Sequence, residues 1–426
     1  MILKALQKLA RCCLIFYCTT GQAQIIEANG DFKIEIETLV KNMPAANSEG
    51  FVKPDSASLA RWRSLINALL DLHFEETDRI VRAHFPAYRL YRFLDTGWAN
   101  QVYYLLRESL PPQKGWGTFA INPNYAREMA VEIPHAGFDL ATEAEGAEIF
   151  RRTGARAFLL NGAARCANRA KTTCDGTWDS CGGGRYPESD MAHAVATCFQ
   201  ATHETMVLRR PQTYVFNLHG HASPACEDFF LSNGRADDPK PLLFDLKQSL
   251  LATNTVRVGI AGDGVSSCPL SGGTNVQGRF ANNSPKPCTQ AATANTGYFF
   301  HIEQSPRVRH DFSLYSLLIT AINANIKPIV TRINSASTAP AAFELTATPN
   351  PLRSRTTLSF FLKAPSVVAI KIYDLVGRET MTLLNEALPA GAHQLTVAAE
   401  HLPAGTYFCR MQAEEVSQNL RLQVIK

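Results

Sequence analysis

Two histidines follow an apolar segment in the stretch "YVFNLHGHASPAC", residues 214–226. The segment alternates as a β-strand does, so His219 shares a face with Asn217 and opposes Leu218. Gly220 ends the expected strand, and His221 follows at once. Neutral imidazole is a common metal ligand, and it also transfers protons near neutral pH. The pattern therefore indicates a metal site or an acid–base centre at the carboxyl end of a strand.

Three other expected strands end in side chains of the same kinds. "AVEIPHAG" ends in His135, "FLLNGAARCANR" in Asn161 and two arginines, and "GYFFHIEQSPRVR" in His301 and Glu303. In α/β sheets, sites lie beyond the carboxyl ends of the strands. Catalytic zinc takes imidazole and carboxylate ligands, three of them from the protein. These strand ends together predict a zinc site.

The expected metal ligands are His135, His219 and one carboxylate from the segment after His135. Three acids compete for the carboxylate position: Asp139, Glu143 and Glu145. We favour Glu143, because "DLATEAEG" runs into a helix start, and a short loop could fold this first-turn residue back toward His135. Glu303 follows an apolar strand and is the expected proton acceptor for the water that the metal activates. The alternative for Glu303 is an ion pair with Arg307 or Arg309.

The segment "AARCANR" places Asn168 between Arg165 and Arg169. A guanidinium group binds carboxylates through two parallel hydrogen bonds, so we expect this segment to hold a substrate carboxylate. Ordinary surface ion pairs are the alternative for both arginines. His221, one glycine beyond the strand, is expected to touch the substrate or to support the metal ligands.

The elements that must position these residues alternate between strand and helix. This alternation predicts an α/β domain, a three-layer, mostly parallel sheet with helices on both faces. One expected helix covers residues 189–210, begins at Ser189 and buries Cys198 as a free thiol. The Gly-rich segment 261–280 lacks the spacing of a phosphate-binding loop, and "GDGVSS" does not match a serine-hydrolase motif.

The order of these motifs resembles that of the zinc carboxypeptidase-like hydrolases, a group that includes N-formylglutamate amidohydrolases and poly-γ-glutamate hydrolases. "EIPHAG" is similar to their first ligand strand, "ANR" to their substrate clamp, "FNLHGH" to a later ligand strand and "FHIEQSPRVR" to the strand of the general base. The resemblance covers about residues 115–325. It implies a zinc-dependent hydrolase that cleaves an amide or peptide bond in a peptide or glutamyl-type substrate. The chain departs from the classical pattern near Gly137 and Phe138, where a glutamate ligand is absent.

The first 23 residues have a basic start, a short apolar run and a small-x-small cleavage pattern, as secretory signal peptides do. We therefore expect residues 24–335 to form the α/β domain outside the cytoplasm, where cysteines pair. The spacing favours a loop closed between Cys174 and Cys181 and another between Cys268 and Cys288. No later segment is long and apolar enough to span a bilayer.

The sequence changes character near residue 335. Residues 336–342 are expected to be a linker, and residues 343–426 show the short alternating segments of an Ig-like β-sandwich. This last segment resembles the type A carboxyl-terminal sorting domain of the type IX secretion system, and four motifs carry the resemblance: Pro349 to Pro351, Tyr373 to Gly377, Pro403 to Tyr407 and the basic Lys426. The resemblance implies contact with the type IX secretion machinery, passage through the outer membrane and removal of the domain afterwards.

Two classes of function remain open after the motifs and the composition are considered together. A formal net charge of +4 with no basic block argues against nucleic-acid binding. The first class is a secreted zinc hydrolase that acts on a carboxylate-bearing amide. The second is a catalytically inactive surface or binding protein on a hydrolase-like fold. Metal content of the purified protein separates the two.

Overall fold

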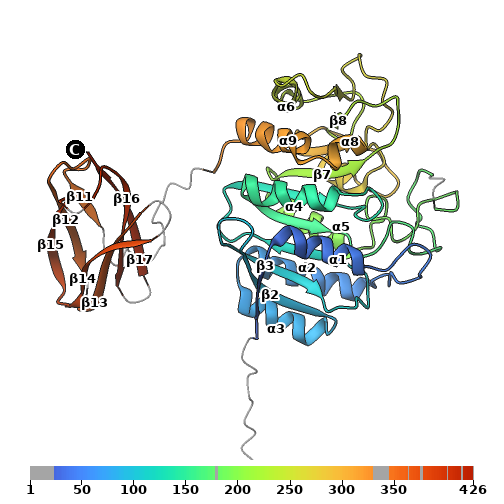
Figure 1. The fold of residues 1–426 in the computed structure, drawn as a ribbon. Helices are drawn as coiled ribbons and strands as arrows, with labels where there is room; N and C mark the ends of the chain where they lie inside the picture. Colours follow the sequence, from blue (N-terminus) through green and yellow to red (C-terminus); the bar gives the residue numbers. More distant parts are fainter. Residues whose placement is uncertain are drawn as a thin grey trace, which may run out of the picture. The chain divides into compact units, whose positions relative to one another are not determined.

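The computed structural model describes residues 24–177, 181–329, 345–362, 364–374, 378–400, 402–413 and 416–425. The chain divides after Ile329 into two compact units (Figure 1). The predicted signal peptide, residues 1–23, and the predicted linker, residues 336–342, lie outside the described residues. In the part of the chain that is described, no helix is long and apolar enough to cross a membrane.

One ten-stranded sheet forms the centre of the N-terminal unit. Its strands, in spatial order, are β1 (Ile26–Gly30), β2 (Tyr88–Asp95), β3 (Gln101–Glu108), β4 (Thr118–Ile121), β6 (Ala155–Leu160), β5 (Arg127–Ile133), β7 (Tyr214–Gly220), β10 (Phe299–Gln304), β8 (Phe229–Ser232) and β9 (Val258–Ile260). Neighbouring strands are parallel in five pairs and antiparallel in four, so the sheet is mixed, and parallel pairs are only a narrow majority. Short connections such as the one between β2 and β3 permit only antiparallel neighbours.

The middle of the sheet keeps the predicted arrangement. Strands β6, β5, β7 and β10 are parallel neighbours, and their carboxyl ends therefore meet at one edge. Alternate residues of β6 face opposite ways: Phe158 belongs to one buried apolar cluster and Leu159 to the other. All six residues of β6 are buried, as is typical of a strand covered on both faces.

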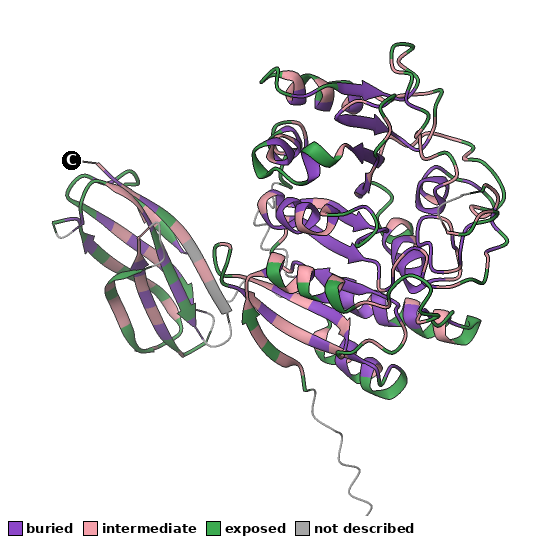
Figure 2. Ribbon diagram, turned by 45° about the vertical axis from the view of Figure 1, so that its right-hand side comes forward, coloured by how far each residue is buried: buried purple, intermediate pink, exposed green. Residues whose placement is uncertain are grey.

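Helices cover both faces of the sheet, as predicted (Figures 1 and 2). One cluster contains residues of α1 (Phe32–Asn42), α4 (Thr142–Thr153), α6 (Pro241–Leu251) and α9 (Phe312–Asn325). The other contains residues of α2 (Ser56–Leu70), α3 (Phe74–His84), α5 (Cys198–Arg209) and α7 (Val276–Ala281). A single short turn of helix, α8 (Pro306–Arg309), follows β10.

Helix α5 is shorter than the sequence predicts. It begins at Cys198 and not at Ser189, because the Thr197 hydroxyl caps it by accepting a hydrogen bond from the Gln200 amide at 3.0 Å. Residues 189–197 are irregular. The expected buried thiol is confirmed, since Cys198 is fully buried and unpaired.

Three disulfides occur in the described part of the chain: Cys166–Cys181, Cys174–Cys288 and Cys226–Cys268. The pairings expected from spacing, Cys174–Cys181 and Cys268–Cys288, are wrong. The loop around Cys174 lies against a distant segment, where the Asp175 amide donates to the Cys288 carbonyl at 3.0 Å. Spacing along the chain cannot show such a contact.

The C-terminal unit is all-β, as predicted. One sheet contains β11 (Thr346–Thr348), β12 (Arg355–Leu362) and β15 (Gly391–Ala398), and the other contains β14 (Glu379–Leu388), β13 (Ser366–Tyr373), β16 (Gly405–Ala413) and β17 (Val416–Val424). All strand pairs within the two sheets are antiparallel. Apolar residues of both sheets, such as Leu358 and Ile370, belong to one buried cluster. An Ig-like arrangement of these strands stays a prediction.

Candidate metal and catalytic site

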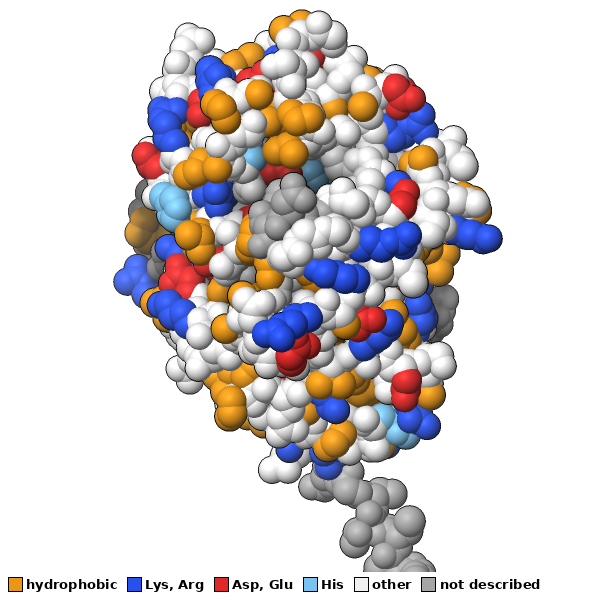
Figure 3. All heavy atoms as spheres, turned by 90° about the vertical axis from the view of Figure 1, so that its right-hand side faces the viewer, with side chains coloured by type: hydrophobic (Ala, Val, Ile, Leu, Met, Phe, Trp, Pro, Cys, Tyr) orange, Lys and Arg blue, Asp and Glu red, His pale blue; other side chains and the backbone are white. Residues whose placement is uncertain are grey.

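A cavity of about 770 Å³ opens where β5, β7 and β10 end. His135, His219, His301 and Glu303 line it. The parallel register pairs Glu303 of β10 with His219 of β7, so two of the predicted strand ends are direct neighbours. Figure 3 shows histidine and acidic side chains at the bottom of a hollow whose rim carries hydrophobic side chains.

Asp139 is the acid that lies beside both predicted histidine ligands. Its Oδ2 is 3.4 Å from Nδ1 of His135 and 3.6 Å from Nδ1 of His219. The three side chains are buried, and their ligand atoms lie within 4.8 Å of one another. A tight turn produces this geometry: the amides of Phe138 and Asp139 both donate to the His135 carbonyl, and Gly137 has a φ of 77°.

The favoured carboxylate, Glu143, lies elsewhere. It occupies the first turn of α4, as predicted, but it is absent from the cavity lining. Burial raises its pKa. Glu145 also lies away from the cavity, where it accepts a hydrogen bond from Gln304 Nε2 at 2.8 Å. The tight turn at Gly137 makes a longer loop unnecessary, so Asp139 replaces Glu143 as the candidate ligand.

The outer nitrogen of each candidate histidine ligand has a fixed partner. Nε2 of His135 lies 2.9 Å from Oδ1 of Asp190, and Nε2 of His219 lies 2.5 Å from Oδ1 of Asn217. The Asn217 amide is oriented in turn, because its Nδ2 donates to Glu132 at 2.9 Å. Partners of this kind fix the tautomer of metal-binding imidazoles and leave the inner nitrogen its lone pair.

The inner nitrogens fit a metal ion. Nδ1 of His135 is buried and has no hydrogen-bond partner among the described residues. Burial lowers the pKa of His219 to about 4, which keeps this imidazole neutral, as a ligand must be. Two imidazoles and one carboxylate form a donor set that suits zinc.

Asp190 joins the site from the segment that the sequence assigns to a helix. It accepts hydrogen bonds from Arg165 Nε at 2.7 Å and from the Ala192 amide at 3.2 Å, and its Oδ1 lies 2.9 Å from Nδ1 of His193. Burial opposes its ionisation, but Arg165 and the two histidines hold the pKa of Asp190 well below its ordinary range. Sequence reasoning missed Asp190, and its only local signal is the Asp-x-x-His spacing to His193.

Glu303 is a buried carboxyl group at the cavity. Its Oε1 lies 3.8 Å from Nε2 of His301, and its Oε2 has no hydrogen-bond partner in the described part of the chain. Burial, followed by the nearby charge of Asp139, raises the pKa of Glu303 well above its ordinary value. Neither Arg307 nor Arg309 lies within 4 Å of it: the ion pair of Arg307 at 3.5 Å is with Asp228.

The predicted substrate-binding residues divide into two groups. Arg165 and His221 line the cavity, and His221 Nε2 bonds to the Glu227 carbonyl at 2.9 Å. Asn168 and Arg169 do not reach the cavity. The Asn168 side chain bonds to both backbone groups of Phe51, and the Arg169 side chain is 80% exposed.

Comparison with known proteins bears on the C-terminal unit. Residues 347–426 match the family described as the secretion system C-terminal sorting domain. This segment is a type IX sorting domain. The sorting domain directs the protein through the type IX secretion system to the cell surface or beyond. Its removal after export stays a prediction.

Three solved structures resemble parts of the chain. Dimeric latent PorU from Porphyromonas gingivalis is 18% identical over 20% of this chain and 10% of its own length, with a TM-score of 0.18, so the chain spans about a tenth of that protein. N-formylglutamate amidohydrolase from Ralstonia eutropha JMP134 is 14% identical over 49% of this chain and 94% of its own, with a TM-score of 0.30. A proposed metallopeptidase from Shewanella amazonensis SB2B is 14% identical over 61% and 92%, with a TM-score of 0.26. No curated protein matches the sequence.

Proposed function

We propose that the N-terminal unit is a zinc-dependent hydrolase that cleaves an amide or peptide bond in a carboxylate-bearing substrate. The observation that carries this proposal is one cavity that holds both a buried two-histidine, one-carboxylate set and the buried carboxyl group of Glu303, whose Oε2 has no hydrogen-bond partner among the described residues. His135, Asp139 and His219 would hold the ion. Zinc, when bound, would polarise the substrate carbonyl and lower the pKa of water.

Glu303 is the proposed proton carrier. A carboxylate whose pKa is raised by burial is a stronger base than an exposed one, so Glu303 can accept a proton from the attacking water and return it to the leaving amine. The β7–β10 register places Glu303 beside His219, one of the proposed metal ligands. His301 stacks on His219 with ring centroids 4.3 Å apart and so limits the movement of the latter.

Arg165 acts in this proposal as a positioning residue. Its Nε bond to Asp190 holds the carboxylate that orients both His135 and His193. His221, on the cavity wall beside Gly220, is the proposed contact to the substrate.

The test is Glu303→Gln, with Glu143→Gln as a control acid outside the cavity. Both variants are assayed for zinc content and for turnover of γ-glutamyl and carboxyl-terminal peptide amides. A glutamine keeps the shape of Glu303 but cannot accept the proton, so we expect retained zinc and a loss of about 10²–10⁴-fold in turnover. Equal rates in both variants would remove Glu303 from the mechanism. A protein without zinc or turnover would be a binding protein on a hydrolase-like fold.

A further inference from the structure

Arg309 is a buried cation without a counter-charge. It ends α8, is 7% exposed and lines the cavity. The single hydrogen bond of its side chain to the described residues runs from Nη1 to the Leu140 carbonyl, and its Nε is buried without a partner. No carboxylate of the described chain lies within 4 Å of its guanidinium group, whereas Arg165 holds Asp190 at 2.7 Å.

The backbone places this guanidinium group at the wall of the cavity. Gln304 of β10 pairs with Gly220 of β7, and the chain then turns back through α8. The guanidinium group packs against Gly220 so closely that a Cβ there would lie 2.4 Å from Cζ of Arg309. Its hydrogen bond to Leu140 reaches the loop that also carries Asp139. Arg309 therefore joins the three loops that follow β5, β7 and β10.

Two buried acids, Glu145 and Glu303, feel the charge of Arg309 but do not pair with it. Glu145 accepts a hydrogen bond from Gln304 Nε2 at 2.8 Å, and Oε1 of Glu303 lies 3.8 Å from Nε2 of His301. A buried charge without a partner is strongly unfavourable, and the penalty is offset when an opposite charge arrives with hydrogen-bond acceptors. The position of Arg309 at the cavity wall lets a ligand supply that charge.

We propose that Arg309 binds the carboxylate group of the ligand that enters this cavity. Nη2 of Arg309 has no hydrogen-bond partner among the described residues, so it can donate to a carboxylate oxygen of a ligand at the cavity wall. The inference deepens the proposed function, on which it rests for the substrate class, because it names the residue that selects a carboxylate-bearing substrate. Carboxylate binding itself requires no hydrolysis, so it is measured independently of turnover.

The test is calorimetric titration of the full mature chain with glutarate and with its neutral diamide, glutaramide. Arg309→Gln is compared with the wild type and with Arg307→Gln. Arg307 is a matched control: it lies two residues away in α8, its side chain is 55% exposed, and it pairs with Asp228 outside the cavity. We expect glutarate to bind Arg309→Gln about 10- to 100-fold more weakly than the other two proteins, and glutaramide to bind all three weakly.

Three outcomes would overturn the assignment. They are equal glutarate affinity in all three proteins, glutaramide affinity equal to that of glutarate, and binding that disappears equally from all three when a chelator removes the metal. If Arg309→Gln does not fold, Arg309→Lys keeps the charge but loses the planar fork, and a loss of about tenfold is expected. Wild-type affinity in the lysine variant would also refute the proposal. A chain without turnover whose glutarate binding depends on Arg309 would contradict the proposed hydrolase and leave this inference standing.

Discussion

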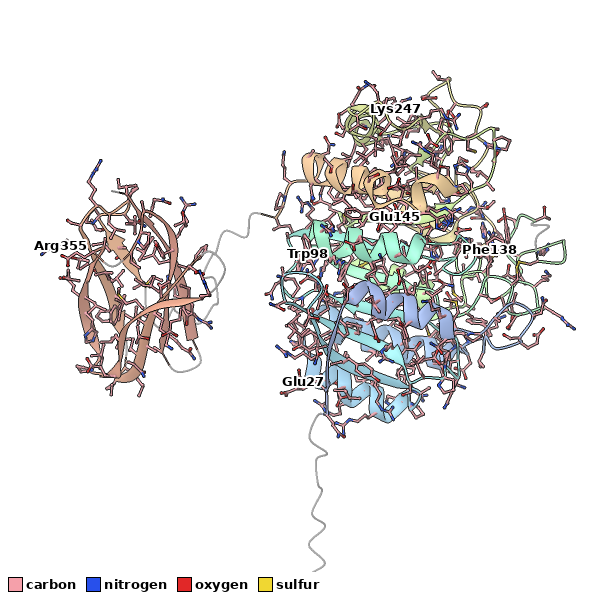
Figure 4. The ribbon with its side chains drawn as sticks, in the orientation of Figure 1. Glu27, Trp98, Phe138, Glu145, Lys247 and Arg355 are labelled. Carbon is pink, nitrogen blue, oxygen red and sulfur yellow. A yellow bond between two sulfur atoms is a disulfide. The ribbon has the colours of Figure 1, made fainter. Side chains whose placement is uncertain are left out.

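The two units differ most in what they bury. Among the described residues of the C-terminal unit, Thr356 is the only buried polar side chain, whereas the N-terminal unit buries charged groups of both signs, many of them at the cavity. Two of the side chains labelled in Figure 4 illustrate the difference: Glu145 lies inside the N-terminal unit on α4, and Arg355 extends from the surface of the C-terminal one. Buried charge costs stability. The described part of the C-terminal unit folds without buried charge, whereas the N-terminal unit carries it at the cavity.

The largest effect is expected at Asp139, the buried acid beside His135 and His219. Asp139→Ala removes one of three proposed ligands, so we expect the purified protein to lose most of its zinc. Glu143→Gln alters an acid of the same segment that does not line the cavity, and its zinc content should equal that of the wild type. Metal analysis of both proteins decides the matter. Zinc loss in the Glu143 variant alone would restore the ligand favoured from the sequence.

A smaller effect is expected at Glu145, which tests whether burial of this carboxyl group lowers the free energy of unfolding of the unit. Burial raises the pKa of Glu145 from 4.5 to about 8. Between these values the folded protein holds a proton that the unfolded chain releases, so the free energy of unfolding falls as the pH rises. Glu145→Gln removes this dependence, and its Nε2 can donate to the unpartnered Oε1 of Gln304.

We expect Glu145→Gln to be more stable than the wild type by on the order of 3 kcal/mol at pH 7, with the difference shrinking toward pH 5. Urea unfolding of both proteins at several pH values measures it. A difference that does not vary with pH would show that the carboxyl group titrates normally.

The smallest effect is expected in the C-terminal unit. The Thr356 hydroxyl is buried and has no hydrogen-bond partner among the described residues. Thr356→Val keeps the shape and removes the unsatisfied group, so we expect the unfolding transition of this unit to gain about 1 kcal/mol. Thr357→Val, on the opposite and partly exposed face of β12, should change little. A loss of stability in Thr356→Val would reveal a partner for the hydroxyl.

The sequence predicts the parts of the site that follow regular elements. His135, His219 and Glu303 sit at the ends of apolar strands, and strands of this type bring their carboxyl ends together. The sequence offers Asp139 as one of three acids but favours Glu143, because Glu143 occupies the first turn of a helix. The turn that returns Asp139 to His135 depends on two hydrogen bonds to one carbonyl and on the conformation of Gly137, which a sequence pattern does not specify.

The parts that escaped prediction depend on distant partners. Asp190 is held by Arg165 and His135, which lie 25 and 55 residues away, and these contacts compete with the helix that local spacing favours. Asn168 is predicted to bind the substrate, but its side chain bonds to Phe51, 117 residues away. Within the sheet, the short hairpins at one side replaced parallel pairing by antiparallel pairing without disturbing the four central strands.

The disulfide pattern also bears on when the cavity is completed. Cys166 directly follows Arg165, and Cys226–Cys268 ties the segment after His221 to the segment that continues into the cavity rim at Pro269. Disulfides form after a chain has left the reducing cytoplasm. The sorting domain directs this protein to export, so the disulfides beside the cavity form only during export. The cavity therefore acquires its disulfides only after the chain has left the cytoplasm in which it is synthesised.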